Sequence, residues 1–199
     1  FAVLTVIMLL TFALPITSAS AAADTCTWTG TTDGDWNDAT NWTGCDNGNI
    51  PENGDILVFP NGPTNKTLNN DIASLDLDSI QISGNGYIIS GNSVELSPVS
   101  STAINFGGSN NNLAMTTTIT SSSTSKSISS SGANNVISAG LVLNLTGGSD
   151  MNIGSSGLDT LTIAGPISGT TQNFIISNGG TVAYNNASTF IATSNLQIN

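Results

Sequence analysis

Residues 141–153 read LVLNLTGGSDMNI, and this stretch decides the expected fold class. Leucines occupy every second position from Leu141 to Leu145, which is the period-2 pattern of a strand with one buried face. The pair Gly147-Gly148 then favours a turn, and the alternation resumes at Met151 and Ile153. Two short strands joined by a glycine turn predict an all-β chain.

Similar apolar sets recur about every seven to ten residues on both sides of this stretch, separated by Gly, Asn and Ser. Each set provides only two or three inward side chains, whereas the strands of a β-sandwich usually run about five to six residues. Short strands of this kind are typical of a β-solenoid, in which each coil pairs with the coils above and below. The sets are Ile80-x-Ile82, Tyr87-Ile88-Ile89, Val94-x-Leu96, Ile104-x-Phe106, Leu113-x-Met115, Val136-Ile137, Leu161-x-Ile163, Phe174-Ile175-Ile176, Val182-x-Tyr184 and Leu196-x-Ile198.

At about 20 to 25 residues per three-strand coil, residues 68–199 would form about five or six coils. No strict sequence period is visible. The segment Thr116–Ser131, TTTITSSSTSKSISSS, fits either Ser/Thr strands around Ile119 and Ile128 or a flexible linker. Because the two isoleucines keep the spacing of the flanking sets, strands are favoured.

The 199 residues include two lysines, thirteen Asp or Glu, no arginine and no histidine, which gives a formal net charge of −11. Two cations cannot neutralise a run of phosphates, so this composition excludes electrostatic binding to nucleic acid and to anionic membranes. A sequence without histidine also excludes histidine triads and histidine metal sites, and no motif indicates a cofactor. In a solenoid, equivalent side chains of successive coils lie about 4.8 Å apart, so uncharged Asn, Ser and Thr stack better than like charges.

Residues 1–23 are predicted to be a signal peptide that is truncated at its start. Phe1–Ile16 contain no charge, and Ala19-x-Ala21 and Ala21-x-Ala23 follow as small-residue cleavage sites. This apolar run is shorter than the roughly twenty residues that cross a bilayer, although a membrane anchor or a buried helix is the alternative. We therefore expect an exported chain, secreted or on the cell surface, with no integral membrane span in its mature part, that continues beyond residue 199.

Residues 24–67 contain both cysteines and all three tryptophans. An even cysteine count in an exported chain predicts a disulfide between Cys26 and Cys45, and two cysteines without histidine make a poor zinc site. The tryptophans are interpreted as a cap over the first coil, because the end of a solenoid exposes an unpaired sheet edge. The alternative is a platform on which flat indoles stack on sugars. These residues are Trp28, Trp36 and Trp42.

The clustered acids provide a candidate for a hard-cation site. Asp33, Asp35, Asn37 and Asp38 place oxygens as in a calcium-binding loop. They do not form an EF-hand, because Asp38 stands where that loop needs Gly and Gly44 where it needs Glu. A turn rich in Asp and Asn is the competing interpretation.

A second set of acids is the candidate for sugar cleavage, because glycoside hydrolysis needs only a pair of carboxylates. Asp71, Asp76 and Asp78 are these candidates, and Asp76-x-Asp78 would place two carboxyls on one strand face, roughly 7 Å apart. No Arg, His or Tyr accompanies them, and Lys66 is the only nearby base in the sequence. A solvated strand face is therefore the competing interpretation.

Two blocks of sequence resemble exported bacterial proteins with autotransporter-associated β-strand repeats. The first is similar to their N-terminal segment and comprises Trp28-Thr29-Gly30, Gly34-Asp35-Trp36-Asn37, Asn41-Trp42, Pro51, Gly54-Asp55 and Val58-Phe59. The second is similar to one copy of the repeat and comprises LTIAGPISG at 161–169, Gly179-Gly180-Thr181-Val182 and Asn185–Thr189. Residues 190–193 depart from the Tyr-Thr-Gly form of that repeat. The resemblance implies a right-handed parallel β-helix displayed outside the cell as a passenger for adhesion or surface interaction.

These observations together predict an all-β, right-handed parallel β-helix with a Trp-rich N-terminal cap at 24–67 and coils at 68–199. The expected function is that of a non-enzymatic secreted or cell-surface segment, either an adhesin-like passenger or a structural stalk. Its partners would be host or environmental glycans or surface proteins. The alternative is a carbohydrate-binding or carbohydrate-cleaving β-helix that uses Asp carboxylates.

Overall fold

The computed structural model describes residues 23–46, 48–157, 159–177, 179–185 and 189–198 of the chain. Nearly all of the predicted signal peptide, 1–23, lies outside these residues. The described part is all-β, because it consists of strands, turns and loops apart from the 3₁₀ helix η1 (Ala39–Asn41). Among the described residues no helix is long and apolar enough to cross a membrane.

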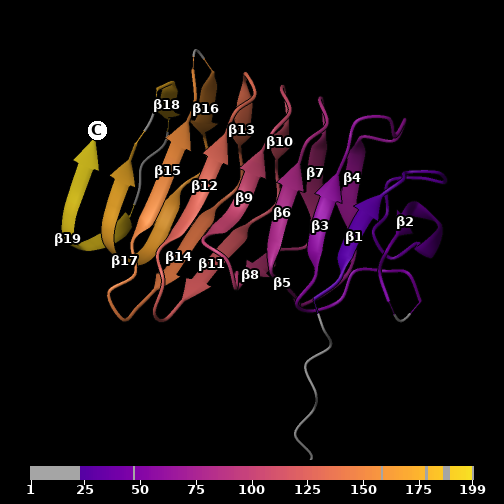
Figure 1. The fold of residues 1–199 in the computed structure, drawn as a ribbon, viewed down its shortest axis with the longest axis horizontal. Coiled ribbons are helices and arrows are strands. Elements are labelled where there is room, and N and C mark those ends of the chain that lie inside the picture. The colour runs from indigo at the N-terminus through magenta and orange to yellow at the C-terminus, as the bar shows by residue number, and fades with distance from the viewer. Residues whose placement is uncertain (1–22, 47, 158, 178, 186–188, 199) are drawn as a thin grey trace, which may run out of the picture.

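The strands wind into a parallel β-solenoid with three faces that run the length of the molecule (Figure 1). Face 1 contains β1 (Thr25–Trp28), β3 (Ile56–Phe59), β6 (Ser79–Ile82), β9 (Thr102–Phe106), β12 (Lys126–Ser130) and β15 (Met151–Ser155). Face 2 contains β5 (Leu75–Leu77), β8 (Val94–Leu96), β11 (Thr117–Ser121) and β14 (Leu141–Leu145). Face 3 contains β4 (Thr67–Asn70), β7 (Ile88–Gly91), β10 (Asn112–Leu113), β13 (Asn135–Ile137), β16 (Thr160–Ile163) and β18 (Thr181–Tyr184).

Two long strands join faces 1 and 2, and a short one lies at the other end. The first part of β17 (Ile167–Ile176) pairs with β14 and its last part with β15, so this strand turns the corner between the faces. β19 (Thr189–Ile198) pairs with β17 in parallel along both parts. β2 (Trp42–Thr43) is antiparallel to β1 at the N-terminal end.

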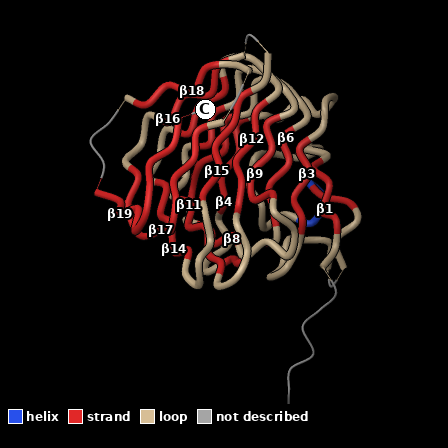
Figure 2. The backbone as a smooth tube through the Cα atoms, turned by 60° about the vertical axis from the view of Figure 1, so that its left-hand side comes forward, coloured by secondary structure: helices blue, strands red, loops and turns tan. Residues whose placement is uncertain are grey.

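Each coil visits face 3, face 2 and face 1 in turn, and five such coils run from β4 to β17. Figure 2 shows strands (red) along the faces and loops (tan) at the corners. The predicted parallel solenoid is therefore confirmed. Parallel stacking already begins with β1 on β3, so the segment before residue 68 shares a sheet with the coils.

The core is a set of apolar columns, each built from one inward residue per coil. On face 3, residues 68, 89, 113, 137 and 163 are Leu or Ile, are stacked in register and are at most 1% exposed. The Ser/Thr-rich segment belongs to the same core, because β11 and β12 bury Ile119 and Ile128 completely. The strand interpretation of Thr116–Ser131 is confirmed.

The corner between faces 1 and 3 repeats from coil to coil through side-chain hydrogen bonds. Asn111 Oδ1 accepts the N–H of Tyr87 at 2.9 Å, and Asn135 Oδ1 accepts the N–H of Asn111 at 3.0 Å, each across 24 residues. Glycines of successive coils touch here, since a Cβ atom on Gly108 would lie 2.0 Å from the Gly84 carbonyl oxygen. These coils thus have a 24-residue period, and their strands keep it too, because residues 80, 104 and 128 of face 1 pair in register.

Candidate functional site

The three tryptophans lie at the N-terminal end of the solenoid and are enclosed by protein. All three are at most 2% exposed, and Trp42 packs edge-on against Trp28 and Trp36, with ring centroids 4.9 and 5.8 Å away. Phe59 lies against the same cluster and links it to the first coils. Because no indole face is open to solvent, these rings offer no surface on which a sugar could stack.

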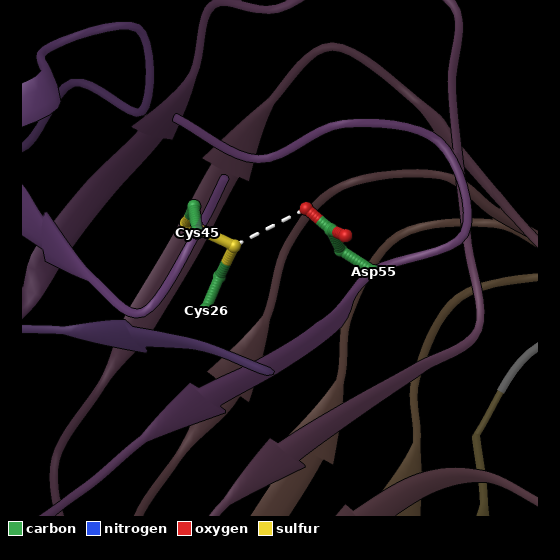
Figure 3. A group of neighbouring side chains, drawn as sticks. All are labelled: Cys26, Cys45 and Asp55. Atoms are coloured by element: carbon green, nitrogen blue, oxygen red, sulfur yellow. Dashed lines mark hydrogen bonds between the residues drawn. A yellow bond between two sulfur atoms is a disulfide. The ribbon is translucent and has the colours of Figure 1, made fainter. Parts of the chain in front are cut away.

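The predicted disulfide between Cys26 and Cys45 is present, with a Cα–Cα distance of 4.7 Å. Asp55 lies beside it, and its Oδ2 is 3.2 Å from the Cys26 sulfur (Figure 3). These are the only three Cys, Asp or Glu residues of the described chain whose ligand atoms lie within 4.8 Å of one another. While the sulfurs are bonded to each other, neither is a thiolate that could bind a metal.

Asp55 is 4% exposed, and its carboxyl group accepts hydrogen bonds from the backbone. It accepts the N–H of Glu52 at 2.8 Å and the N–H of Asp24 at 3.1 Å. Burial raises the pKa of Asp55, the two N–H groups lower it, and the charges of Asp24 and Glu52 raise it further. No sequence pattern indicates this contact, because residues 26 and 55 are 29 positions apart.

The four candidates for a hard-cation site are engaged in turn hydrogen bonds. Asp33 Oδ1 accepts the N–H of Asp35 at 3.0 Å, and Asp38 Oδ1 accepts the N–H of Thr40 at 2.9 Å at the start of η1. The Thr40 hydroxyl, and then its N–H, lower the pKa of Asp38. The backbone N–H of Asn37 donates to an acid of the neighbouring coil, and Asp35 accepts from an Asn side chain there. These bonds are those of a turn rich in Asp and Asn.

A groove of about 350 Å³ at the corner between faces 2 and 1 brings together two of the three candidates for sugar cleavage. Asp76 and Asp78 both line it, with Ser97 and the 91% exposed Val99. Asp78 lies beyond the end of β5, so the two acids do not share one face of a regular strand as expected. The third candidate, Asp71, lies elsewhere and accepts the N–H of residue 37 at 2.8 Å.

The surroundings of Asp76 in this groove raise its pKa. Asp76 stacks in register on Glu95 of the next coil. Burial raises the pKa of Asp76, a hydrogen bond from Ser97 lowers it, and the charge of Glu95 raises it. Its Oδ1 atom is buried without a hydrogen-bond partner among the described residues. A carboxyl group whose pKa is raised, close to a second carboxylate, has two of the properties of a general acid.

Two buried charged groups hold the loop that borders this groove. Asp78 Oδ1 accepts the N–H of Val99 at 2.6 Å. Lys126 is 2% exposed, and its Nζ donates to the carbonyl oxygens of Pro98 and Ser100 at 2.5 and 2.9 Å. Burial lowers the pKa of Lys126, and attraction to Asp78 partly offsets this effect.

Lys126 is therefore the lysine that interacts with an acid of this groove, whereas the sequence suggested Lys66. Lys66 instead donates to the carbonyl oxygen of Asn85 at 2.9 Å and lies over the Tyr87 ring. The sequence did not predict that Lys126 holds the loop beside this groove. Its place two positions before Ile128 in an alternating strand is the signal that would have located it inside.

No family model matches this chain, and comparison with curated proteins and with solved structures finds no similar protein. The arrangement of the residues is therefore the basis for assigning a function.

Proposed function

We propose that the chain is a non-enzymatic β-solenoid segment of a secreted or cell-surface protein, serving as an adhesin-like passenger or a structural stalk. The observation that carries this proposal is the unbroken parallel stack from β1 to β19 along face 1 and its corner. With about 4.8 Å per strand, the eight strands of this stack span about 34 Å. A rod of this kind lengthens by one strand spacing for each added coil, which suits a stalk or a display scaffold.

The outer surface supports the same proposal. Outward positions of face 1 in successive coils are Gln81, Asn105, Ser129 and Gly154, all uncharged and in register. Ser129 donates its hydroxyl to Asn105 Oδ1 at 3.0 Å, so neighbouring coils are linked on the outside as well. Rows of short polar groups provide many hydrogen-bonding sites for a glycan or a protein surface without the repulsion of stacked charges.

The resemblance to autotransporter-associated repeats adds a second line of support. Residues 161–169 form most of β16, a corner and the start of β17, and residues 179–182 lead into β18. The repeat-like block thus corresponds to about one coil of the solenoid. Right-handed coiling, the N-terminal cap and export through residues 1–23 belong to this proposal as well.

Export and ligand binding are separately testable. Fusing residues 1–23 to a reporter enzyme that is active only outside the cytoplasm should give activity, and a matched Leu9→Arg fusion should lose it. The purified chain should bind members of a glycan and surface-protein array if it is a passenger, and none of them if it is a stalk. A reporter that stays inactive would contradict the proposal.

A second candidate function is carbohydrate binding or cleavage, which the groove containing Asp76 and Asp78 favours. Asp76 combines a raised pKa with neighbouring carboxylates, as a general acid does. A reducing-sugar release assay on polysaccharides separates the two candidates. Release by the natural chain that disappears in Asp76→Asn would replace the non-enzymatic proposal, whereas no release from either chain would support it.

A further inference from the structure

The Cys26–Cys45 disulfide is unequal at its two ends. Cys26 lies on β1 and is fully buried, whereas Cys45 lies in the loop after β2 and is only partly buried. Asp55 is within hydrogen-bond distance of the buried sulfur, with its Oδ2 3.2 Å from the Cys26 Sγ (Figure 3). An external thiol can therefore reach the bond more readily at Cys45, while the sulfur that it would displace faces a carboxyl group.

The contact between sulfur and carboxyl depends on a proton. A sulfur in a disulfide carries none, so this contact is a hydrogen bond only when Asp55 is protonated. Burial of Asp55 favours the protonated form. After reduction the same 3.2 Å contact would suit a Cys26 thiol that donates to an Asp55 carboxylate. The pair can thus share one proton in both redox states.

We propose that Cys26–Cys45 is an exchangeable disulfide, in which external thiols react at Cys45 and Asp55 is the acid–base catalyst for Cys26. The external reactant is a low-molecular-weight thiol or a dithiol oxidoreductase. Geometry supports this assignment, because Asp55 touches the leaving sulfur and Cys45 lies on the accessible side.

In reduction, a thiolate attacks the Cys45 sulfur and forms a mixed disulfide with it. The Cys26–Cys45 bond breaks, its electron pair goes to the Cys26 sulfur, and the Asp55 carboxyl gives its proton to that sulfur. A second thiolate then attacks the external sulfur of the mixed disulfide and releases Cys45 as a thiolate. Two external thiols become one disulfide, while the protein disulfide becomes two thiols. Formation of the bond follows the same steps in reverse, with Asp55 carboxylate removing the proton from Cys26.

The exchange would change how the N-terminal end is anchored. The Cys45 loop is otherwise held by the two residue pairs of β2 on β1 and by the Asp46 N–H, which donates to Asp24 Oδ2 at 3.0 Å. Breaking the disulfide leaves these contacts and the Asn49 side chain, which donates to the Ala39 and Trp42 carbonyl oxygens, and it makes Cys45 a site for thiol modification. The charged groups facing Asp55 are Asp24 and Glu52, and both oppose its ionisation.

The test compares the natural chain with Asp55→Asn and with the control Asp46→Asn. Asp46 follows Cys45 in the same loop, is exposed, and is not among the charged groups that shift the pKa of Asp55, so its variant reports the effect of altered loop charge alone. Each chain is reduced with glutathione and reoxidised with oxidised glutathione between pH 5 and pH 9. Maleimide labelling follows the free thiols, and mass spectrometry locates the glutathione adduct.

We expect Asp55→Asn to slow both directions by about tenfold or more at equal thiolate concentration, since general acid–base catalysis contributes about 10² to 10⁴. Asp46→Asn should stay within about twofold of the natural chain, and the adduct should form on Cys45 alone. Equal rates for the two variants, or an adduct on Cys26, would overturn the proposal. If Asp55→Asn loses the near-ultraviolet circular dichroism signal of the tryptophan cluster, the variant is not folded and the test rests on the natural chain. The reoxidation rate of the natural chain, corrected for the thiolate concentration, should fall at low pH, where the Asp55 carboxylate becomes protonated. A corrected rate that does not fall would also overturn the proposal.

Discussion

Replacing Gly108 with alanine tests the stacking that defines the corner between faces 1 and 3. A Cβ atom at this position would lie 2.0 Å from the Gly84 carbonyl oxygen and 2.5 Å from its carbonyl carbon. The obstacle is backbone, so no side-chain rotation relieves it. Gly107 provides the matched control, because a Cβ atom there meets nothing closer than 3.5 Å.

The expected cost follows from the contacts that would have to separate. Carbon and carbonyl oxygen approach to about 3.3 Å, so the two coils must move apart by roughly 1.3 Å at this corner. The N–H groups of Gly107 and Gly108 donate to the Ile82 oxygen at 2.9 and 3.0 Å, and Asn111 Nδ2 donates to the Gly84 oxygen at 3.0 Å. At about 1 kcal/mol for each hydrogen bond, Gly108→Ala should lower the free energy of unfolding by about 2–3 kcal/mol.

Urea and thermal unfolding, followed by circular dichroism, measure this difference. For a chain of this size the loss corresponds to a melting temperature lower by about 5–10 °C. Gly107→Ala should be neutral or stabilise by up to about 1 kcal/mol, because alanine restricts the unfolded chain. Equal unfolding midpoints for the two variants would refute the close approach of successive coils.

Three further predictions concern single side chains. Asn135→Ala removes amide hydrogen bonds to the Gly108 and Gly132 carbonyl oxygens at 2.8 and 2.7 Å, and denaturant unfolding should show a free energy of unfolding lower by about 3 kcal/mol. A decrease of less than about 0.5 kcal/mol would contradict the role of these Asn hydrogen bonds in joining successive coils. Burial raises the pKa of Tyr87 to about 12, so the unfolded chain releases the phenolic proton first. Stability should fall by up to about 2.7 kcal/mol between about pH 10 and 12, and Tyr87→Phe should lack this part of the fall. Because the fold disfavours the Asp76 carboxylate, Asp76→Asn should stabilise the chain at pH 7 by up to about 1 kcal/mol after solvent screening. This gain should vanish below about pH 4, where the natural side chain is also neutral, and a variant less stable at pH 7 would show that the carboxylate is favourable there.

The solenoid could be predicted because inward positions alternate over very short strands. Ile119 and Ile128 identified two strands inside a Ser/Thr-rich segment that composition alone would assign to a linker. The period itself was hidden, because Leu68, Ile89, Leu113 and Ile137 form one column with coil lengths of 21, 24 and 24 residues. Coils of unequal length preserve strand register while they shift the sequence repeat, so the 24-residue period holds only over the coils of equal length.

Contacts in the candidate sites could be predicted from the sequence only where they follow from the residue types involved. The disulfide could be predicted because the chain contains only two cysteines, and the clustering of the three tryptophans because they lie close together in the sequence. Asp55 and Lys126 were not found, because their partners lie 29 and 26 to 28 residues away and belong to other coils. Contacts between coils depend on the exact coil length, which short-range patterns do not determine.

The low charge of the coils follows from the stacking of their outward side chains. Outward positions of face 2 begin with Asp76 on Glu95, and Thr118, Val142 and Ser168 then continue the same row without charge. The stacked acid pair is tolerated where Asp76 holds its proton more tightly and where Thr120 donates to Glu95 Oε1 at 2.6 Å. A third acid in this row would add another repulsive neighbour about 4.8 Å away. Stacking thus disfavours a third carboxylate in this row, and any ligand that depends on the acid pair is expected in the groove of Asp76 and Asp78.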